Sequence, residues 1–583
     1  MAARSLHRQL CALGLLPFFL AACAAVGGRL RQPAPPPAVI EPKSGEAEVI
    51  DHYLKAKVAV DAGDYVRAIA EYQKVIAVDA DAVMPRLRLA TLYVRVGNLP
   101  GAVEQCDAVV ASDPDNLEAR LLRAGVLMAL GRDDDAVAEY LEVLARDPEN
   151  QEAYLYLGAL YAKQDRPADA KAAFRKLIAI NPRSVLGYYH LGRVNALGKS
   201  YGDAEAAFEK ALDLSPHSEQ VVVALAVVYQ MQGRRDQAIT AYKRFLRANP
   251  ENVEIRRRLG NLLVGERKFD EALEQLQEIE DLETDPRETR TKIGLIYFEK
   301  EDYESAITAF NLVLASNPDD HRVRYYLGVA YAAAKQPKDA ERELRAIPPQ
   351  AQQYVDARLH LAYLYQGQGN MDAAIAVVRE GLEHREHDVD LLGMLASLYR
   401  EQKDLESASE ILEGMVARDP ENDRLRFTLG ALYDEAKQKD KTIAEMRRAI
   451  ELNPRNAAAL NYLGYTFAEM GVHLDEAEDL VRRALEIEPN EGFYVDSLGW
   501  IYYQRGDYSQ AVKHLEAAVE LSGDDPTISE HLGDAYEKVG RNEDALRLYR
   551  QALSSSDEAE QVDRLRKKIT ALENAENAQR VTP

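Results

Sequence analysis

Several features that define other protein classes are scarce in this sequence. Its 583 residues include only three cysteines and one tryptophan, and no block shows the alternating pattern of β-strands. So few cysteines exclude a disulfide-rich fold. Lysine and arginine number 72 against 96 aspartates and glutamates, which leaves a net charge of −24. This acidic balance argues against a nucleic-acid partner, because a phosphate backbone requires a basic surface.

Near its N-terminus the chain also lacks an apolar run long enough to span a membrane. The run from Leu10 to Ala22 follows the basic residues Arg4 and Arg8. A membrane span needs about 20 apolar residues, so this run is too short and is typical of a secretory signal. We therefore predict that residues 1–22 are a targeting segment.

The targeting segment ends in a short motif, Leu20-Ala21-Ala22-Cys23, which resembles the bacterial lipobox. The resemblance implies cleavage before Cys23, lipidation of its thiol and acylation of its amine. Ala24 then implies transfer to the outer membrane, with the protein facing the periplasm, although an inner-membrane anchor stays open. The alternative is an ordinary secretory signal with a chance cysteine.

Cleavage before Cys23 would leave a proline-rich tether at the start of the mature chain and one thiol that is not lipidated. Residues 23–48 contain Pro33, Pro35, Pro36 and Pro37, which favour an extended polyproline conformation. At roughly 3.1 Å per residue, such a segment could hold the next domain up to about 60 Å from the lipid. The remaining thiol, Cys106, falls at an inward-facing register, so we predict a buried apolar residue rather than a reactive thiol.

A fixed period dominates the rest of the chain. Prolines recur every 34 residues from Pro114 to Pro250, and alanines keep the same step from Ala68 to Ala408. The alanine series resumes one residue late at Ala477. A period of this length indicates one supersecondary unit stacked many times, so function should lie on an extended surface.

Residues 151–184 show the unit. Apolar residues at helical spacing run from Tyr154 to Tyr161 and again from Ala170 to Ile178, with polar residues between them. Small residues recur at the position of Gly158, which predicts close approach of the two helices of a pair.

This pattern resembles the tetratricopeptide repeat. The residues that carry the resemblance in this unit are Tyr154, Leu157, Gly158, Tyr161, Ala170, Phe174 and Pro182. It implies an all-α, right-handed superhelical solenoid of about fifteen helix-turn-helix repeats over residues 49–559, with a capping helix and tail over residues 560–583. The expected repeat starts are Val49, Val83, Leu117, Gln151, Val185, Glu219, Val253, Arg287, His321, Val355, Val389, Asp423, Ala457, Gly492 and Pro526.

Three departures from the pattern predict local irregularities. Pro348-Pro349 shortens one second helix, Thr442 replaces a small alanine, and one residue is inserted near Val472-His473. In the final segment, Leu565, Ile569 and Leu572 share one face, as a terminal cap requires.

Motifs that resemble catalytic or metal sites occur in the wrong context. Gly198-Lys199-Ser200-Tyr201-Gly202 matches the Gly-x-Ser-x-Gly pattern but falls in a helix-to-helix turn rather than a strand-to-helix elbow. His384 and His387 have no second ligand cluster in the sequence. We expect no enzyme, no cofactor and no metal.

In tetratricopeptide proteins the first helix of each repeat lines a concave groove, mainly through its second, fifth, ninth and twelfth positions. Carried onto this sequence, the resemblance implies a protein-binding groove that includes Tyr53, Met84, Leu87, Tyr189, Arg257, Asn261, Arg322, Tyr325, Tyr363, Phe427, Tyr465, Phe493, Asp496, Trp500 and Tyr503. Packing against the next repeat is the alternative role for each residue. The family's carboxylate clamp for chaperone tails is matched in part by Arg257, Asn261 and Arg322, but Lys292 stands where an asparagine is expected.

These features favour a lipid-anchored scaffold that recruits protein partners in the periplasm. Leu463-Gly464-Tyr465 and the stretch from Asp496 to Trp500 resemble motifs of proteobacterial lipoproteins of this repeat type. Some of these act as adaptors that present murein hydrolases to a carboxyl-terminal processing protease. The alternative is an accessory lipoprotein for outer-membrane assembly, pili, or polysaccharide export and secretion. The sequence leaves the partner and the oligomeric state open.

Overall fold

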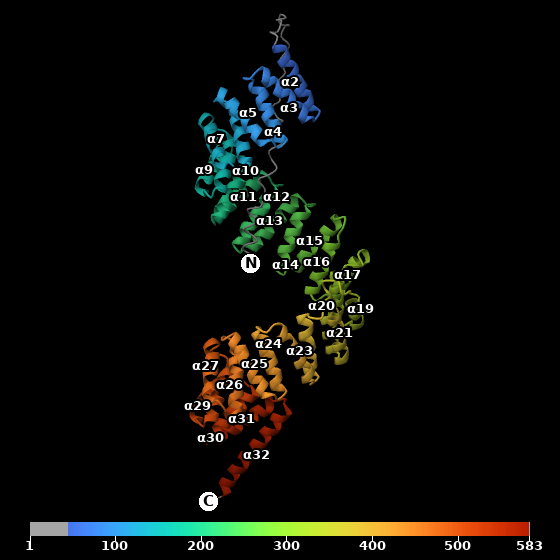
Figure 1. Cartoon of the computed structure of the whole chain (residues 1–583), viewed down its shortest axis with the longest axis vertical. Coiled ribbons are helices and arrows are strands. Elements are labelled where there is room, and N and C mark those ends of the chain that lie inside the picture. Colours follow the sequence, from blue (N-terminus) through green and yellow to red (C-terminus); the bar gives the residue numbers. More distant parts are fainter. Residues whose placement is uncertain (1–44, 582–583) are drawn as a thin grey trace. The chain divides into compact units, whose positions relative to one another are not determined.

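The computed structural model describes residues 45–581, and the side chains among them up to residue 574 (Figure 1). The predicted signal segment, the lipidated Cys23 and most of the predicted tether lie outside the described residues. The described residues form 31 α-helices, α2 to α32, and no strand. The all-α prediction is therefore confirmed.

The helices alternate between the first and second members of successive pairs. The first helices are α2 (Glu46–Asp61), α4 (Val83–Arg95), α6 (Leu117–Ala129), α8 (Gln151–Lys163), α10 (Val185–Leu197), α12 (Glu219–Met231), α14 (Val253–Gly265), α16 (Arg287–Glu299), α18 (His321–Ala333), α20 (Tyr354–Gly367), α22 (Val389–Glu401), α24 (Asp423–Glu435), α26 (Ala457–Met470), α28 (Gly492–Arg505) and α30 (Pro526–Lys538).

The second helices are α3 (Tyr65–Val78), α5 (Leu99–Ser112), α7 (Asp133–Arg146), α9 (Pro167–Ile180), α11 (Tyr201–Leu214), α13 (Arg235–Ala248), α15 (Phe269–Leu282), α17 (Tyr303–Ser316), α19 (Pro337–Arg345), α21 (Met371–His384), α23 (Leu405–Arg418), α25 (Lys439–Leu452), α27 (Leu474–Ile487), α29 (Tyr508–Ser522) and α31 (Asn542–Ser555). The last helix is α32 (Ala559–Val581).

All but two first helices begin at the residue that the repeat frame predicts. The exceptions are α20, which begins at Tyr354, and α2, which begins at Glu46 rather than Val49. Glu46 and Glu48 lie in the first turn of α2, where carboxylates interact favourably with the positive end of the helix dipole. This interaction accounts for the additional residues at the start of α2.

Small residues allow the two helices of a pair to approach closely, as predicted. The periodic alanines of the second helices, from Ala68 to Ala545, are completely buried. A Cβ atom added at Gly158 would lie 2.6 Å from Cε1 of Phe174, and one at Gly533 would lie 2.5 Å from Cε1 of Tyr549. At such distances an alanine would force the neighbouring ring to shift, so glycine is favoured at these positions.

A recurring arginine, not predicted from the sequence, binds the turn between repeats. In α6, Arg120 donates to the backbone carbonyl of Pro114 (2.8 Å) and to a carboxylate oxygen of Glu139 on α7 (3.2 Å). The fourth residue of a first helix plays this part repeatedly, through Arg86, Arg120, Arg256, Arg324 and Arg426. Each arginine thereby satisfies a turn carbonyl and joins it to its own helix pair.

The predicted irregularities are present. Helix α19 has 9 residues where most second helices have 14, because the chain leaves the helix before Pro348-Pro349. The inserted residue lies in the turn after α26, where Gly471 (φ 64°) and His473 (φ 49°) both adopt the left-handed conformation. Thr442 is fully buried at the alanine position, and its hydroxyl donates to the carbonyl of Gln438.

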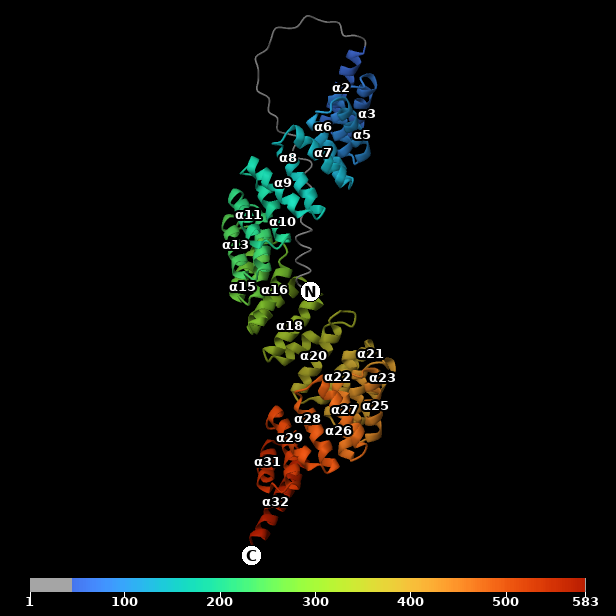
Figure 2. The ribbon, with the colours of Figure 1, turned by 90° about the vertical axis from the view of Figure 1, so that its left-hand side faces the viewer.

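The described helices form two compact units, the first ending at Ile296 and the second beginning at Tyr297. Figures 1 and 2 show the helices coloured in chain order from blue to red. Within each unit, second helices pack against the first helix of their own pair and the first helix of the next pair, as α9 does with α8 and α10. The apolar core of each unit is therefore a series of clusters along the stack rather than one central cluster. Cys106 lies in this core with no exposed surface, as predicted.

The C-terminal unit ends in the predicted cap. Leu565 and Leu572 of α32 are buried against α31, and Ile569 packs beside them. Lys567 occupies the position that Gly158 and its equivalents have in earlier first helices, and it pairs with Asp563 (2.6 Å) on the same helix. The side of α32 that would receive another second helix is therefore polar, so α32 closes the stack.

Candidate protein-binding surface

The predicted groove residues all lie on first helices, and their exposure differs widely. Asn261, Arg322, Met84, Tyr363 and Phe493 are exposed. Intermediate exposure is found for Tyr53, Arg257, Tyr325, Phe427, Tyr465, Trp500 and Tyr503. Leu87, Tyr189 and Asp496 are buried.

The buried members contribute to packing between helices in the free chain. Leu87 forms a small core cluster with Val109 and Ala119, because α4 packs against α5 and α6 at this point. The ring of Tyr189 lies 6.0 Å from that of Phe208 and 5.2 Å from that of His190. Contact of these residues with a partner stays a prediction, as it does for the other groove residues.

Exposed aromatic side chains are concentrated on this surface. Among the phenylalanine, tyrosine and tryptophan residues of 45–574, only Tyr363 (59%) and Phe493 (53%) are exposed. Both occupy predicted groove positions, on α20 and α28. The other phenylalanine, tyrosine and tryptophan residues described by the structure are half-buried or buried. An exposed aromatic ring is costly in water and is a common anchor for a protein partner.

Trp500, the only tryptophan, forms part of a stack of rings. The His531 ring of α30 lies 4.1 Å from it with a 17° angle between the planes. The Tyr503 ring lies 4.5 Å away and is almost parallel, at 5°. Trp500 is therefore positioned by its neighbours, and only part of it is exposed to solvent.

A buried ion pair lies beneath this stack. Nδ1 of His531 is 3.0 Å from both carboxylate oxygens of Asp496, and both side chains are less than a tenth exposed. Burial alone would lower the pKa of His531, but Asp496 outweighs it, and the pKa of His531 is raised. The pair joins α28 to α30, which explains why Asp496 faces inward rather than toward a ligand.

Helix α32 supplies cations to acidic residues at groove positions of α30. Glu530 accepts hydrogen bonds from Arg564 (2.7 Å) and Lys568 (2.9 Å), and Lys568 also donates to Asp534 (2.5 Å). Burial opposes ionisation of Glu530, but these donors hold its pKa at about 2. The cap is thus fastened by charge as well as by apolar packing. Glu530, Arg564 and Lys568 were not among the predicted site residues, although they fall on groove positions of the repeat frame.

In the N-terminal unit, the groove face contains two hollows at equivalent places in the repeat. The first, of about 300 Å³, lies between α8 and α10. Its lining is largely apolar and includes Ala159, Ala162, Phe174 and Val194, with His190 and Arg193 beside them. The His190 ring stacks on Phe174 at 5.4 Å and 13°. Burial, followed by the charge of Arg193, lowers the pKa of His190 to about 4, so this ring is neutral near pH 7.

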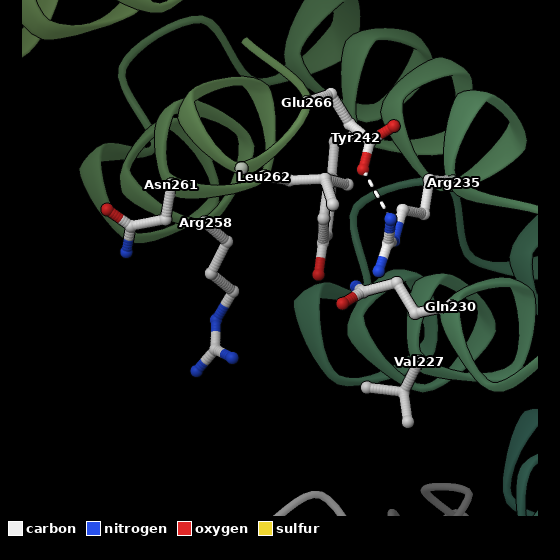
Figure 3. Close-up of a pocket in the computed structure, with 9 residues that line it drawn as sticks. Val227, Gln230, Arg235, Tyr242, Arg258, Asn261, Leu262 and Glu266 are labelled. Carbon is white, nitrogen blue, oxygen red and sulfur yellow. Dashed lines mark ion pairs between the residues drawn. The ribbon is translucent and has the colours of Figure 1, made fainter. Parts of the chain in front are cut away.

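The second hollow lies between α12 and α14, two repeats further on, and has a volume of about 340 Å³ (Figure 3). Tyr242 occupies the place that Phe174 has in the first hollow, and Arg258 occupies that of His190. Figure 3 shows Arg235 and Arg258 on opposite sides, with Gln230 between them. Arg235 pairs with Glu266 at 2.8 Å, and this hollow is therefore polar and rich in donors.

The partial match to the carboxylate clamp is not supported by the surroundings of Arg257. Its guanidinium donates to Glu283 (2.8 Å) and pairs with Glu254 (3.4 Å), so its charge is already balanced. Asn261 lines the second hollow instead. Arg322 lies on α18 in the other unit.

The described residues contain no group of three or more histidine, cysteine, aspartate or glutamate side chains that could hold a metal ion. Ser200 lies at the start of α11 in a helix-to-helix turn, where Lys199 is left-handed (φ 58°), so this motif lacks the elbow of a hydrolase. Across residues 45–581, no helix combines the length and the apolar character needed to cross a membrane.

Models of the tetratricopeptide repeat match most of the helical region. Two of these models match residues 53–116, 87–151, 223–286 and 427–491, and residues 297–363 and 365–433, respectively. Two further repeat models match residues 499–540 and 530–562. Residues 129–249 also match a model of the middle tetratricopeptide-like domain of cilia and flagella-associated protein 70. No curated protein sequence matches the chain.

Several solved structures are similar at low identity. A tetratricopeptide repeat protein from Parabacteroides merdae ATCC 43184 is 17% identical, with a TM-score of 0.32 over 49% of this chain and 99% of its own. Yeast Tom70 is 15% identical, with a TM-score of 0.32 over 92% of this chain and 97% of its own. At these scores the likenesses say nothing about function, and the family assignment depends on the repeat models and on the helices themselves.

Proposed function

This chain is a tetratricopeptide-repeat protein, and from that premise we propose that it is a lipid-anchored scaffold of the cell envelope. It binds protein partners through the groove face of its first helices. The observation that carries the proposal is the location of Tyr363 and Phe493, the exposed aromatic residues described above, at predicted groove positions. A stacked-repeat fold offers this kind of long surface for extended peptides or partner helices.

The proposed anchor and location rest on the N-terminal sequence alone. The lipobox-like Leu20–Cys23 motif supports lipidation of Cys23, and Ala24 supports the outer membrane, facing the periplasm. Metabolic labelling with a clickable fatty acid should mark the wild-type chain and not Cys23→Ser. Equal labelling of both chains, or labelling of neither, would refute the lipid anchor and would leave the proposed binding surface unaffected.

The proposed pathway is presentation of murein hydrolases to a carboxyl-terminal processing protease. It rests on the resemblance of Leu463-Gly464-Tyr465 and Asp496–Trp500 to motifs of adaptor lipoproteins. Crosslinking in intact cells, with the lipidated chain as bait and mass spectrometry as the readout, should recover both a protease and a cell-wall hydrolase. Recovery of secretin or polysaccharide-export components in their place would favour an accessory role in export.

The binding surface is tested by a matched pair of variants. Phe493→Ala removes an aromatic side chain that is 53% exposed on a first helix, whereas Leu312→Ala removes an apolar side chain that is 51% exposed on the second helix α17. We expect Phe493→Ala to reduce recovery of the crosslinked partners at least fivefold and Leu312→Ala to leave it unchanged. Equal recovery with both variants would exclude the α28 face as a binding surface.

A further inference from the structure

The two hollows of the N-terminal unit occupy the same place in the repeat but differ in chemistry. Both lie between successive first helices, and each has the ring of the preceding second helix among its lining residues, Phe174 in one and Tyr242 in the other. The hollow between α8 and α10 is hereafter the apolar hollow, and the hollow between α12 and α14 the polar hollow. Volumes of about 300 and 340 Å³ are at the lower end of the range for ligand pockets and suit single side chains.

The wall that α8 contributes to the apolar hollow consists mainly of small apolar side chains. Ala159 and Ala162 occupy the ninth and twelfth positions of this helix, where α12 carries the larger Val227 and Gln230. The neutral His190 ring, stacked on Phe174, adds a flat aromatic wall. Lys163, at the edge, is already paired with Asp133 (2.7 Å). Arg193, the other cation of the lining, lies 5.7 Å from the centre of the Tyr189 ring. An apolar side chain, and an aromatic one best, would fill this space.

The polar hollow calls for a hydrogen-bond acceptor. Nε of Arg258 is buried and has no hydrogen-bond partner among the described residues, although its Nη2 lies 2.8 Å from Glu254. A buried donor without an acceptor is unfavourable and is rare in folded proteins. Gln230 and Asn261 provide further donors around the same space, and Arg235 lies beside it, paired with Glu266 at 2.8 Å. A carboxylate satisfies a guanidinium better than any other side chain does.

The spacing of the hollows sets the spacing of the groups that would fill them. They are separated by two repeats within one unit. Neighbouring packed helices lie about 8–10 Å apart, so two repeats correspond to roughly 20 Å along the groove face. An extended chain advances about 3.3 Å per residue, and it therefore covers this distance in about six residues.

We propose that the N-terminal unit binds an extended peptide segment of its partner, with an apolar or aromatic side chain in the apolar hollow and a carboxylate side chain in the polar hollow about six residues away. This inference rests on the proposed protein-binding function and specifies the sequence that the surface selects. The recognition is by two side-chain sites at a fixed separation. Peptides with only one of the two side chains bind more weakly.

The test uses a display library of random 14-residue peptides selected on the full chain. We expect enriched peptides to carry an aromatic or large aliphatic residue and an aspartate or glutamate five to seven residues apart. Enriched peptides without this spacing would overturn the inference, and so would a selection that enriches nothing. Recovery of envelope partners by the same chain would, in either case, leave the proposed function standing.

Matched variants then assign each side chain to its hollow. Ala159→Phe fills the apolar hollow and should weaken binding of a selected peptide at least tenfold, whereas Ala168→Phe on the exposed start of α9 should not. Ala162→Leu gives a second, milder filling in case the first variant folds poorly. Unchanged affinity in both hollow variants would refute the placement of the apolar side chain.

A double-mutant cycle tests the polar hollow. Arg258→Gln should weaken binding of the acidic peptide about tenfold, and it should have little effect on the same peptide with its carboxylate replaced by the amide. Arg247→Gln, on an exposed face of α13, is the control for loss of one positive charge. Equal losses for the acidic and amide peptides would show that Arg258 does not contact the carboxylate, which would contradict the proposal.

Discussion

Glycine at the eighth position of the first helices gives the sharpest test of the packing. A Cβ atom at Gly158 would lie 2.6 Å from Cε1 and 2.8 Å from Cζ of Phe174, a completely buried ring. Gly260 occupies the same position in α14, yet a Cβ atom there would have no neighbour nearer than 3.9 Å. The same substitution, glycine to alanine, should therefore have opposite effects at the two sites.

The magnitudes follow from two competing effects. Alanine stabilises a helix interior by about 0.5–1 kcal/mol relative to glycine. Overpacking a close contact costs about 1–3 kcal/mol. Gly260→Ala gains the first and avoids the second, so its free energy of unfolding should rise by up to about 1 kcal/mol. Gly158→Ala has the same gain, but the larger overpacking cost outweighs it, so this variant should be destabilised by about 0.5–2 kcal/mol.

Native-state hydrogen exchange is the appropriate assay, because a stack of repeats does not unfold in one step. Amides of α8 and α9 should exchange faster in Gly158→Ala, and amides of α14 and α15 should exchange more slowly in Gly260→Ala. Adding Phe174→Leu to Gly158→Ala should restore part of the protection by making room for the methyl group. Stabilisation by Gly158→Ala, equal to that by Gly260→Ala, would refute the close approach of α8 and α9.

Three further predictions concern the titratable groups. Asp496→Asn should lower the pKa of His531, measured by NMR titration. Because the pKa of His531 is raised in the folded chain, the ion pair stabilises the fold below about pH 6.5, and this stabilisation is lost as pH rises through the folded-state pKa. In Asp496→Asn the free energy of unfolding should no longer change with pH in this way. Glu530, with its pKa lowered to about 2, contributes on the order of 2–3 kcal/mol of stability above about pH 4.5, and this stability is lost as pH falls toward 2. In Glu530→Gln the stability of the C-terminal helices should therefore depend less on pH in this range. Burial raises the pKa of Cys106 to about 12, and this thiol should resist alkylation at pH 8 until the chain is unfolded; rapid labelling of the native chain would contradict its burial.

The fold could be predicted almost entirely from the period of the sequence. Helix starts, the short α19, the insertion after α26 and the cap α32 all follow from which residues recur and where the recurrence fails. A repeat makes this possible because each unit packs against its neighbours in the same way. The recurring arginine exemplified by Arg120 was equally visible at 34-residue steps, but its role depends on a turn carbonyl that the sequence does not display.

The surface could be predicted less well, because exposure depends on the size of neighbouring side chains. The same fifth position holds Leu87, buried between α5 and α6, and Tyr53, which is half-exposed. The hollow at Ala159 arises from residues on three helices, and no single motif marks it. The ion pair of His531 could not be predicted from the sequence, because its partner Asp496 lies 35 residues away, in the preceding repeat.

The most direct test of the account is site-specific photocrosslinking in living cells. A photoreactive residue would be placed at Tyr363 or Phe493 on the first helices, and at Leu312 or Leu141 on the second helices α17 and α7. The account predicts discrete crosslinked partners from the first-helix positions and none from the second-helix positions. Crosslinks to the same partners from all four positions, or from the second helices alone, would contradict a binding surface on the first helices.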